Sequence, residues 1–329
     1  MTARSRDEDE RRKRRKRLLQ GLLVGGAAIG IPALANFLIA RRAARPQTPS
    51  WGRSHRYAWQ YGEIAFQRLG DGPPLVLVHS FGPGHDSQQW RRTAELLAKR
   101  RTVFVPDLLG WGRSEKPALT YDGELYIQLL SDFLHDVVRA RSPVVAAGLA
   151  AAYAVQIAVD EPEAIAALGL VVPLGIETHG DEPDFKDAIV HRLLRLPVIG
   201  TSALNLYTSR SGLSHHLQEA YAVPDRVDAA LLEHHYRSSH QKGGRAALAA
   251  YLAGYLNHAV EDTVARLQTP VWLAWGRGAT TPPVESADLW LRAAAHSELE
   301  VFERAGNLPH AETPIAFGQK LEGFLSRIG

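Results

Sequence analysis

Residues 75–82 read LVLVHSFG, and this short stretch decides how the chain is organised. Its first four residues are wholly apolar, as expected for a strand that is buried on both faces of a sheet. Similar apolar runs begin at residues 102, 144, 168 and 271, with segments of helical type between most of them. Strands that alternate with helices predict a mostly parallel sheet covered on both faces.

The expected elements extend from this stretch in both directions, and together they form an α/β core over residues 57–173 and 263–329. Tyr57–Tyr61 and Glu63–Leu69 predict a hairpin. Asp86 is a candidate N-cap for a helix over residues 86–99. The other expected strands are Thr102–Val105, Val144–Ala147, Leu168–Val172, Val271–Trp275 and Leu299–Phe302, and the other expected helices are Leu125–Ala140, Ala151–Val159, Val284–Ala295 and Ile315–Arg327.

Residues 174–262 interrupt the alternation. They contain patterns typical of helices only, over Phe185–Leu196, Thr201–Ser209, His215–Ala222, Asp225–Tyr236 and Arg245–Asn257. A helical insertion between two strands of a parallel sheet predicts a cap over the carboxyl ends of the strands.

Composition and charge limit the classes of protein to consider. The 329 residues are 45% hydrophobic and 22% charged, which is typical of a globular protein. There is no cysteine, which excludes disulfides and thiolate nucleophiles. The net charge of +3 comes from the N-terminus: residues 1–17 hold nine Lys and Arg against four acids, and residues 18–57 hold five Arg and no acid. The rest of the chain is acidic, so we expect no nucleic-acid partner.

An uncharged segment follows the basic tail. Leu18–Ala40 has no charged residue and, at about 1.5 Å per helical residue, is long enough to cross a hydrocarbon core of about 30 Å. We therefore expect one transmembrane helix in contact with lipid, followed by a juxtamembrane linker over residues 41–56. Two pairs of glycines at a spacing of four would admit a helix of another membrane-protein subunit: Gly21 with Gly25, and Gly26 with Gly30.

The same segment has a second interpretation. Residues 33–35, Ala-Leu-Ala, resemble a signal-peptidase site, which would make the segment a cleaved signal. The apolar run, however, continues to Ile39 and then meets Arg41 and Arg42, and this favours a retained anchor. The larger basic excess before the segment predicts a cytoplasmic N-terminus and a globular domain on the outer face.

Four landmarks in order give residues 60–328 a family resemblance. They are the strand and loop at 75–82, the stretch PDLLGWGRS at 106–114, Trp-Gly at 275–276 and Ala-Gly at 305–306. In this order they resemble the α/β-hydrolase superfamily with a helical cap. The resemblance implies a nucleophile on a tight strand-to-helix turn, a histidine that takes its proton and a carboxylate that orients the histidine.

Each of these three positions holds a residue without the required chemistry. Residues 144–153 read VVAAGLAAAY, and alignment with the family places Gly148 at the nucleophile position, with Ala150 as a rival register. The acid position holds Ala279 and the histidine position holds Asn307. Glycine and alanine carry no nucleophilic atom, and an amide is no general base near pH 7.

The residues around these three positions still match the family's pattern. The resemblance implies that the backbone N–H groups of Phe81 and Leu149 are oxyanion-hole donors, and that His79 and His310 lie beside the pocket in structural roles. Ser80 is a conceivable nucleophile, but the sequence offers no recognisable base for it.

The fourteen histidines raise the question of a metal site. His215 with His216 and His234 with His235 are adjacent pairs in the predicted cap. Neighbours on a helix point about 100° apart, so neither pair faces one ion. We interpret both pairs as polar helix surface and expect neither a metal nor a cofactor.

These patterns predict a membrane-anchored, non-catalytic protein with the α/β-hydrolase fold. Its role would be that of an accessory or scaffold subunit, or of a protein that binds a small apolar ligand under the cap. The alternative is an active hydrolase that uses non-standard residues on a small apolar ester-like substrate.

Overall fold

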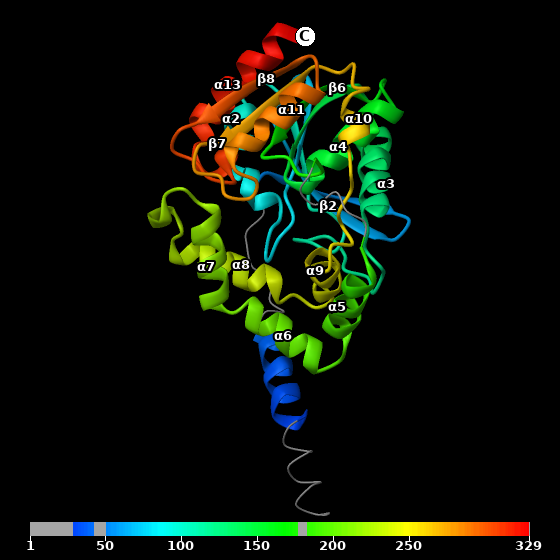
Figure 1. Ribbon diagram of the computed structural model, residues 1–329, viewed down its shortest axis with the longest axis vertical. Helices are drawn as coiled ribbons and strands as arrows, with labels where there is room; N and C mark the ends of the chain where they lie inside the picture. Colours follow the sequence, from blue (N-terminus) through cyan, green and yellow to red (C-terminus); the bar gives the residue numbers. More distant parts are fainter. Residues whose placement is uncertain (1–28, 43–50, 177–182, 329) are drawn as a thin grey trace, which may run out of the picture.

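A mostly parallel sheet forms the centre of the molecule (Figure 1). The computed structural model describes residues 29–42, 51–176 and 183–328. Within them the strand order is β1-β2-β4-β3-β5-β6-β7-β8, and all neighbours are parallel except the pairs β1–β2 and β2–β4. The strands are β1 Arg53–Trp59, β2 Gly62–Leu69, β3 Pro74–Val78, β4 Thr102–Pro106, β5 Ser142–Ala147, β6 Ile165–Val171, β7 Val271–Gly276 and β8 Ser297–Phe302.

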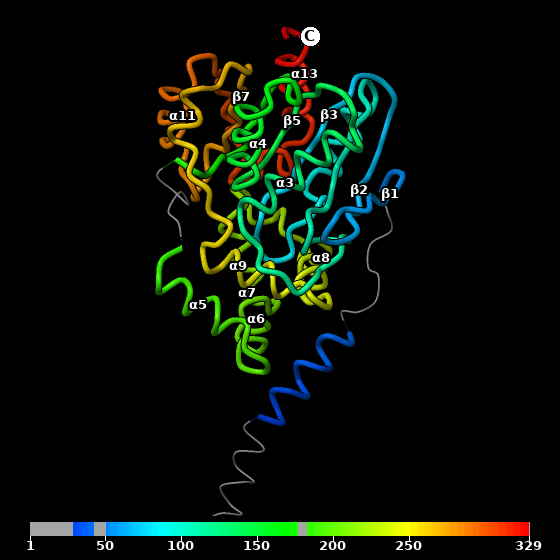
Figure 2. Tube along the Cα trace, turned by 90° about the vertical axis from the view of Figure 1, so that its right-hand side faces the viewer, coloured from blue at the N-terminus to red at the C-terminus, as the bar shows by residue number. Residues whose placement is uncertain are grey.

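The central strands are apolar because helices cover both of their faces. Every residue of β4 and β7 is buried. Helix α2 (Arg91–Leu97) packs with α13 (Pro314–Ile328), and α3 (Gly123–Phe133) packs with α4 (Leu149–Asp160). Figure 2 shows α3 and α4 together on the near side of the sheet. The expected fold, a parallel sheet between two layers of helices, is confirmed.

The cap consists of helices that lie beyond one end of the sheet, away from the C-terminus (Figure 1). They are α5 Phe185–Arg195, α6 Ile199–Tyr207, α7 Arg210–Ala220, α8 Ala229–Ser239 and α9 Arg245–Leu252. The short helices α10 Glu261–Val264, α11 Ala287–Ala293 and α12 Pro309–Glu312 belong to the core. Short 3-10 turns cover Ser87–Trp90, Pro224–Arg226 and Val284–Ser286.

Local side-chain bonds shift several boundaries from those expected. Helix α7 begins earlier because the Ser209 side chain caps it, and α8 begins later because Pro224 opens a separate turn and Asp228 then caps the helix. The expected helix over residues 125–140 ends in a π-helical turn at Leu134–Val138. Asp86 caps a 3-10 turn that precedes α2, rather than α2 itself.

The N-terminal part of the chain contacts the cap. Residues 29–42 form a helix, and the Asn36 side chain donates to Val198 O and Ser202 Oγ and accepts from Asn205 Nδ2, all at 2.8–3.2 Å. Strand β1 begins at Arg53, inside the range expected to be a linker. Among the described helices, none has both the length and the apolar character needed to cross a membrane.

The structure leaves the expected anchor and its helix-packing glycines largely untested. Residues 18–28, with Gly21, Gly25 and Gly26, lie outside the described residues. A Cβ on Gly30 would have no described neighbour within 4 Å.

Candidate functional site

The turn between β5 and α4 has the form of a nucleophile elbow but carries no side chain. Gly148 lies at the turn with φ 59° and ψ −127°, a backbone that favours glycine. Its N–H donates to Val171 O at 3.0 Å, and its carbonyl accepts from Ala151 N at 3.2 Å. Ala150 lies inside α4, so the structure places Gly148 at the elbow.

Ser80 fills the space beside the elbow. An ideal Cβ on Gly148 would lie 3.3 Å from Ser80 Cβ, closer than most such contacts. The hydroxyl Oγ of Ser80 lies 2.9 Å from His85 Nδ1 and 3.2 Å from Gln89 Oε1. A candidate base therefore stands next to Ser80, contrary to the sequence interpretation.

The loop after Ser80 brings His85 back to it. Gly82 and Gly84 have φ of 153° and 77°, and His85 N donates to Gly82 O at 3.1 Å. The glycine spacing was the one sequence signal of such a turn. Burial, with His235 and His216 nearby, holds the pKa of His85 well below its usual range. His85 is therefore neutral and accepts protons only weakly.

Asn307 braces two loops instead of acting as a base. Its Oδ1 accepts from Thr280 N at 2.8 Å and from Thr281 N at 3.3 Å. These bonds join the loop after β8 to the loop after β7, beside the buried Ala279. Because β5, β7 and β8 are parallel, Gly148, Ala279 and Asn307 all follow strand ends at one edge of the sheet.

His79 ties the loop after β3 (residues 79–86) to the loop after β4. Its Nδ1 donates to Ser80 O at 2.8 Å, and its Nε2 accepts from Leu108 N at 3.0 Å. These two bonds fix a neutral tautomer, and burial lowers the pKa of His79. His79 thus holds the backbone that leads to Phe81, whose ring packs on Tyr126 with centroids 4.8 Å apart.

His310 is buried against aromatic rings. Its ring stacks on Trp90 with centroids 3.8 Å apart, and it also contacts Phe317. Neither ring nitrogen has a hydrogen-bond partner among the described residues. Burial lowers the pKa of His310 to about 3. The imidazole is neutral and enclosed, so it is poorly placed to act as a general base.

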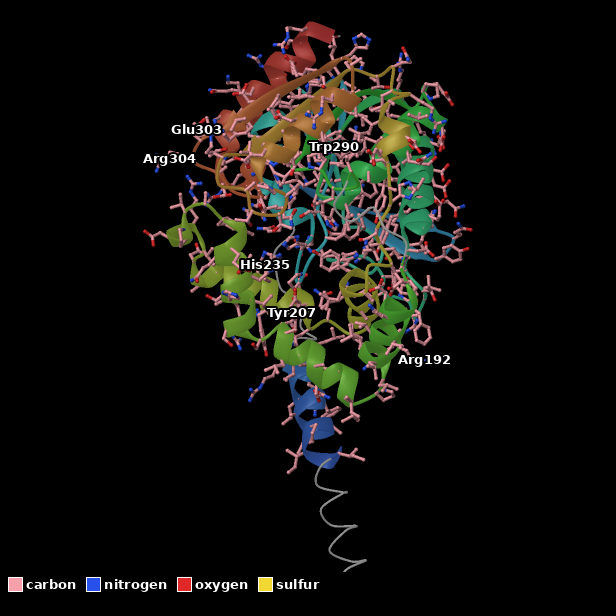
Figure 3. All side chains as sticks on the ribbon, in the orientation of Figure 1. Arg192, Tyr207, His235, Trp290, Glu303 and Arg304 are labelled. Carbon is pink, nitrogen blue, oxygen red and sulfur yellow. The ribbon has the colours of Figure 1, made fainter. Side chains whose placement is uncertain are left out.

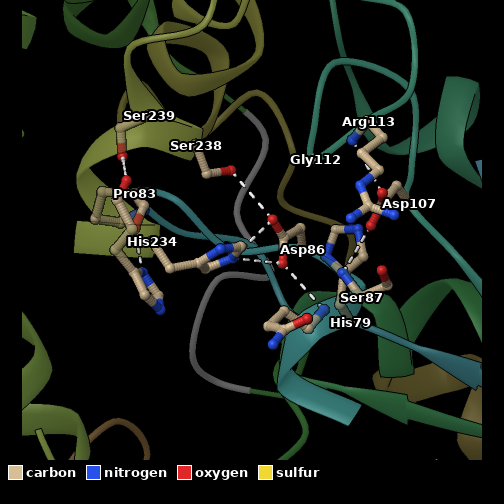
Figure 4. A network of polar contacts seen from close by, with 12 residues as sticks. His79, Pro83, Asp86, Ser87, Asp107, Gly112, Arg113, His234, Ser238 and Ser239 are labelled. Atoms are coloured by element: carbon tan, nitrogen blue, oxygen red, sulfur yellow. Dashed lines mark hydrogen bonds and ion pairs between the residues drawn. The ribbon is translucent and has the colours of Figure 1, made fainter. Parts of the chain in front are cut away.

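A buried polar network joins the cap to the core (Figure 4). The Asp86 carboxylate accepts from His234 Nε2 at 3.0 Å and from Ser238 Oγ at 3.2 Å, both on α8. His235 Nδ1 donates to Pro83 O at 2.9 Å. Burial opposes charge on Asp86, but His234 outweighs this effect and the pKa of Asp86 falls. Burial likewise disfavours a charged His234, yet Asp86 raises the pKa of His234.

These contacts correct the interpretation of the histidine pairs as polar surface. His234 and His235 lie between cap and core, and the rings of His235 and His85 have centroids 5.4 Å apart. His216 faces His85 at 6.3 Å, whereas His215 is exposed. Over the described part of the chain, no group of three or more potential ligands is arranged to hold a metal ion.

Glu312 forms a second connection between cap and core. Its carboxylate accepts from Gly306 N at 2.6 Å and from Ala222 N at 2.9 Å, and lies 3.4 Å from Arg226. Burial raises the pKa of Glu312. The carboxylate therefore holds the loop of Asn307 against the end of α7.

Comparison with known proteins agrees with this geometry. The model of the Alpha/beta hydrolase family matches residues 75–319. The chain belongs to the alpha/beta hydrolase family. An uncharacterized protein of Mycobacterium tuberculosis is 30% identical over 300 residues, which cover 86% of this hydrolase-family chain and 83% of that protein.

Two further similarities involve proteins with stated activities. A 2-hydroxy-6-oxo-6-(2'-aminophenyl)hexa-2,4-dienoic acid hydrolase of Metapseudomonas resinovorans is 25% identical over 272 residues, which cover 80% of this chain and 88% of that protein. The crystal structure of a bacterial membrane phospholipase A superposes with a TM-score of 0.68 at 21% identity, over 95% of this chain and 99% of that chain. At this identity, the second similarity shows the hydrolase fold alone.

Proposed function

We propose that this chain is a membrane-anchored member of the hydrolase family without the family's catalysis, which serves as an accessory or scaffold subunit or binds a small apolar ligand under its cap. The observation that carries the proposal is the elbow of Gly148, which is built but has no nucleophile. Ser80 fills the adjacent space, and Asn307 is engaged as a brace. Loss of nucleophile and base removes most of the rate enhancement of a catalytic triad.

The test is reaction of the purified full chain with a fluorophosphonate probe, together with an assay on short-chain p-nitrophenyl esters. We expect neither covalent labelling nor saturable turnover. An active member of the family at the same concentration is the positive control. Stoichiometric labelling of this chain would falsify the non-catalytic proposal.

A second candidate function is hydrolysis of a small apolar ester, and one contact favours it. Ser80 Oγ and His85 Nδ1 are 2.9 Å apart, as a nucleophile and its base would be. In this scheme the hydroxyl proton passes to His85 Nδ1 while Oγ attacks the ester carbonyl. His85 then returns the proton to the leaving alcohol, and water hydrolyses the acyl group on Ser80.

The depressed pKa of His85 and the burial of Ser80, which is 8% exposed, make this candidate the weaker one. Ser80→Ala and His85→Gln should each abolish labelling if Ser80 is the nucleophile. Ser326→Ala, on the remote helix α13, is the matched control. Labelling that persists in Ser80→Ala would exclude Ser80.

The membrane anchor is supported by the uncharged run Leu18–Ala40, flanked by basic residues. The positive-inside rule favours a cytoplasmic N-terminus and an outward-facing globular domain. The full chain should stay in the membrane pellet after washing at high pH, whereas a chain that lacks residues 1–42 should be released. Release of the full chain by the same wash would contradict an integral anchor.

A further inference from the structure

Exposed apolar side chains concentrate in two segments that are far apart in the sequence. Among the described residues, all large hydrophobic side chains with high exposure belong to residues 29–38 or 185–207, except Tyr61, Ile315 and Ile328. The most exposed are Phe185 at 80%, Leu206 at 75%, and Ile31 and Ile199 at 70%. Single exposed apolar residues need no explanation, but a gathered set marks an interaction site.

The two segments lie together at one end of the molecule. Figures 1 and 2 show the helix of residues 29–42 next to α6, at the end opposite to the C-terminus. The bonds of Asn36 with Val198, Ser202 and Asn205 fix this contact. Figure 3 shows Arg192 and Tyr207 at the same end. The helices therefore expose their apolar residues on a common end of the protein.

The exposed residues follow the period of a helix surface. Phe185, Ile189 and Leu193 are four residues apart on α5, and Ile199 and Leu206 are seven apart on α6. Such spacings put side chains on one side of each helix. The opposite sides pack inward, through His191 on α5 and Leu204 on α6. Both helices are thus amphipathic, with an apolar side that no described element covers.

The charges around these residues are basic. Residues 29–42 end in Arg41 and Arg42, and neither this helix nor α6 contains an acid. On α5 the acids Asp184 and Asp187 are engaged in the capping box at the start, and Arg192 and Arg195 lie in the last turn. An apolar surface bordered by basic side chains is complementary to a bilayer with anionic headgroups.

A groove runs along α5 beside these arginines. Its volume is about 600 Å³, and its lining includes Phe185, Ile189, His191, Arg192, Arg195 and Tyr255. His191 is 7% exposed, and its Nε2 is buried without a hydrogen-bond partner among the described residues. The groove thus combines two arginine cations with apolar walls, which suits a phosphate that carries acyl chains.

We propose that α5 and α6, with the end of the residue 29–42 helix that contacts α6, form a lipid-docking face, which lies in the interface of an anionic bilayer where the Leu18–Ala40 anchor enters it, and which holds a phospholipid phosphate in the α5 groove. The inference rests on the proposed membrane location and extends it by naming the surface in contact and the lipid class. A second copy of the chain fits less well, because an isologous contact would set the basic borders of two such faces against each other.

The absence of cysteine allows a direct test on the full chain. Ile189→Cys and Leu206→Cys place single labelling sites on the lipid-docking face, and Tyr61→Cys and Ile315→Cys are controls of comparable exposure elsewhere. Each variant carries an environment-sensitive fluorophore and is reconstituted into phosphatidylcholine vesicles with or without phosphatidylglycerol. We expect a blue shift and quenching by spin-labelled lipid at positions 189 and 206, but not at 61 and 315.

A second experiment tests whether docking depends on the arginines of α5. Arg192→Gln with Arg195→Gln should remove the increase in quenching that phosphatidylglycerol causes at position 206, whereas Arg292→Gln on α11 should not. Soluble glycerol phosphate should not reverse the quenching. Reversal would show a site for a free phosphate compound and overturn the proposal for lipid.

The outcomes separate this inference from the anchor. A chain that fails to float with vesicles contradicts the proposed membrane location itself. A chain that floats while all four positions behave alike keeps the anchor and overturns the docking face. A blue shift without lipid quenching, together with a doubled mass in light scattering, assigns the face to a second copy and also overturns the proposal.

Discussion

Ser80 borders the position that a side chain on Gly148 would take, since a Cβ built on Gly148 would lie 3.3 Å from Ser80 Cβ. The turn at Gly148 and the loop after β3 therefore pack against each other. Ser80 supplies a side chain at this contact, whereas Gly148 supplies none. A change at either position alters the space available at the other.

The first prediction concerns this coupling. Gly148→Ala should lower the free energy of unfolding by about 1–2 kcal/mol, because the backbone at φ 59° disfavours a side chain. In a Ser80→Gly background the loss should be smaller by about 0.5 kcal/mol or more, since the contact is gone. A double-mutant cycle in urea measures the difference. Strictly additive effects would show that the two positions do not share space.

The second prediction concerns restoring catalysis. Gly148→Ser, Ala279→Asp and Asn307→His supply the triad, but the new serine would be crowded by Ser80. We expect the triple variant to have weak esterase activity, and the quadruple variant with Ser80→Gly to have more. Rates on p-nitrophenyl esters at equal folded concentration measure this.

Stability is the control for the repair experiment. Asn307→His removes the Oδ1 that accepts two solvent-exposed backbone N–H bonds, at an expected loss of about 0.5–1.5 kcal/mol. Urea unfolding of each variant must therefore accompany the rates. A triple variant as active as the quadruple one would contradict crowding at Ser80.

The third prediction concerns the link between Asp86 and His234. Asp86→Asn keeps the cap of the Ser87–Trp90 turn but leaves His234 without its anion, so we expect a loss of about 3 kcal/mol near pH 6. The raised pKa of His234 means that the pair stabilises the fold below the unfolded-state pKa, near 6.5, and weakens as pH rises through the folded-state value. The loss should therefore shrink as the pH rises above that of the first measurement. Equal losses at pH 6 and 8.5, with His234→Gln as the companion variant, would argue against an ion pair.

The fourth prediction concerns His310. Its pKa of about 3 in the folded state lies below the unfolded value, so the unfolded chain binds the extra proton and stability falls as pH drops below about 6.5. At pH 5 this effect is roughly 2 kcal/mol. His310→Phe removes this pH-dependent loss of stability and keeps the stacking on Trp90. The free energy of unfolding of the variant, relative to that of the wild type, should therefore increase as the pH is lowered from 7.5 to 5. Urea unfolding at both pH values checks this; a constant difference would refute the assignment.

The sequence was most informative where the physics is local. Apolar runs such as residues 75–78 predict buried strands, and their alternation with helices predicts a parallel sheet without knowledge of distant contacts. The family resemblance pointed to Gly148, Ala279 and Asn307, which lie in the loops that follow β5, β7 and β8. Helix boundaries were less certain, since capping by Ser209 and Asp228 competes with the apolar period.

The contacts around Ser80 depend on tertiary structure. Gly82 and Gly84 indicate a turn but do not show that His85 meets Ser80, and no spacing shows that His234 reaches Asp86 from the cap or that Asn307 holds Thr280. Asn307 and Thr280 lie in loops after different strands, and His234 reaches Asp86 from a cap helix, so the geometry of these two contacts exists only after the sheet and the cap have come together.

The sequence by itself predicted the α/β architecture from short-range periodicity and established the absence of cysteine chemistry, and the family resemblance assigned Gly148, Ala279 and Asn307 to the positions of nucleophile, acid and histidine. Only the tertiary structure decided which side chains fill the space of the missing triad and which helices expose apolar faces beside residues 29–42. Burial and hydrogen bonding between distant segments are properties of the packed chain, and local sequence patterns do not predict them.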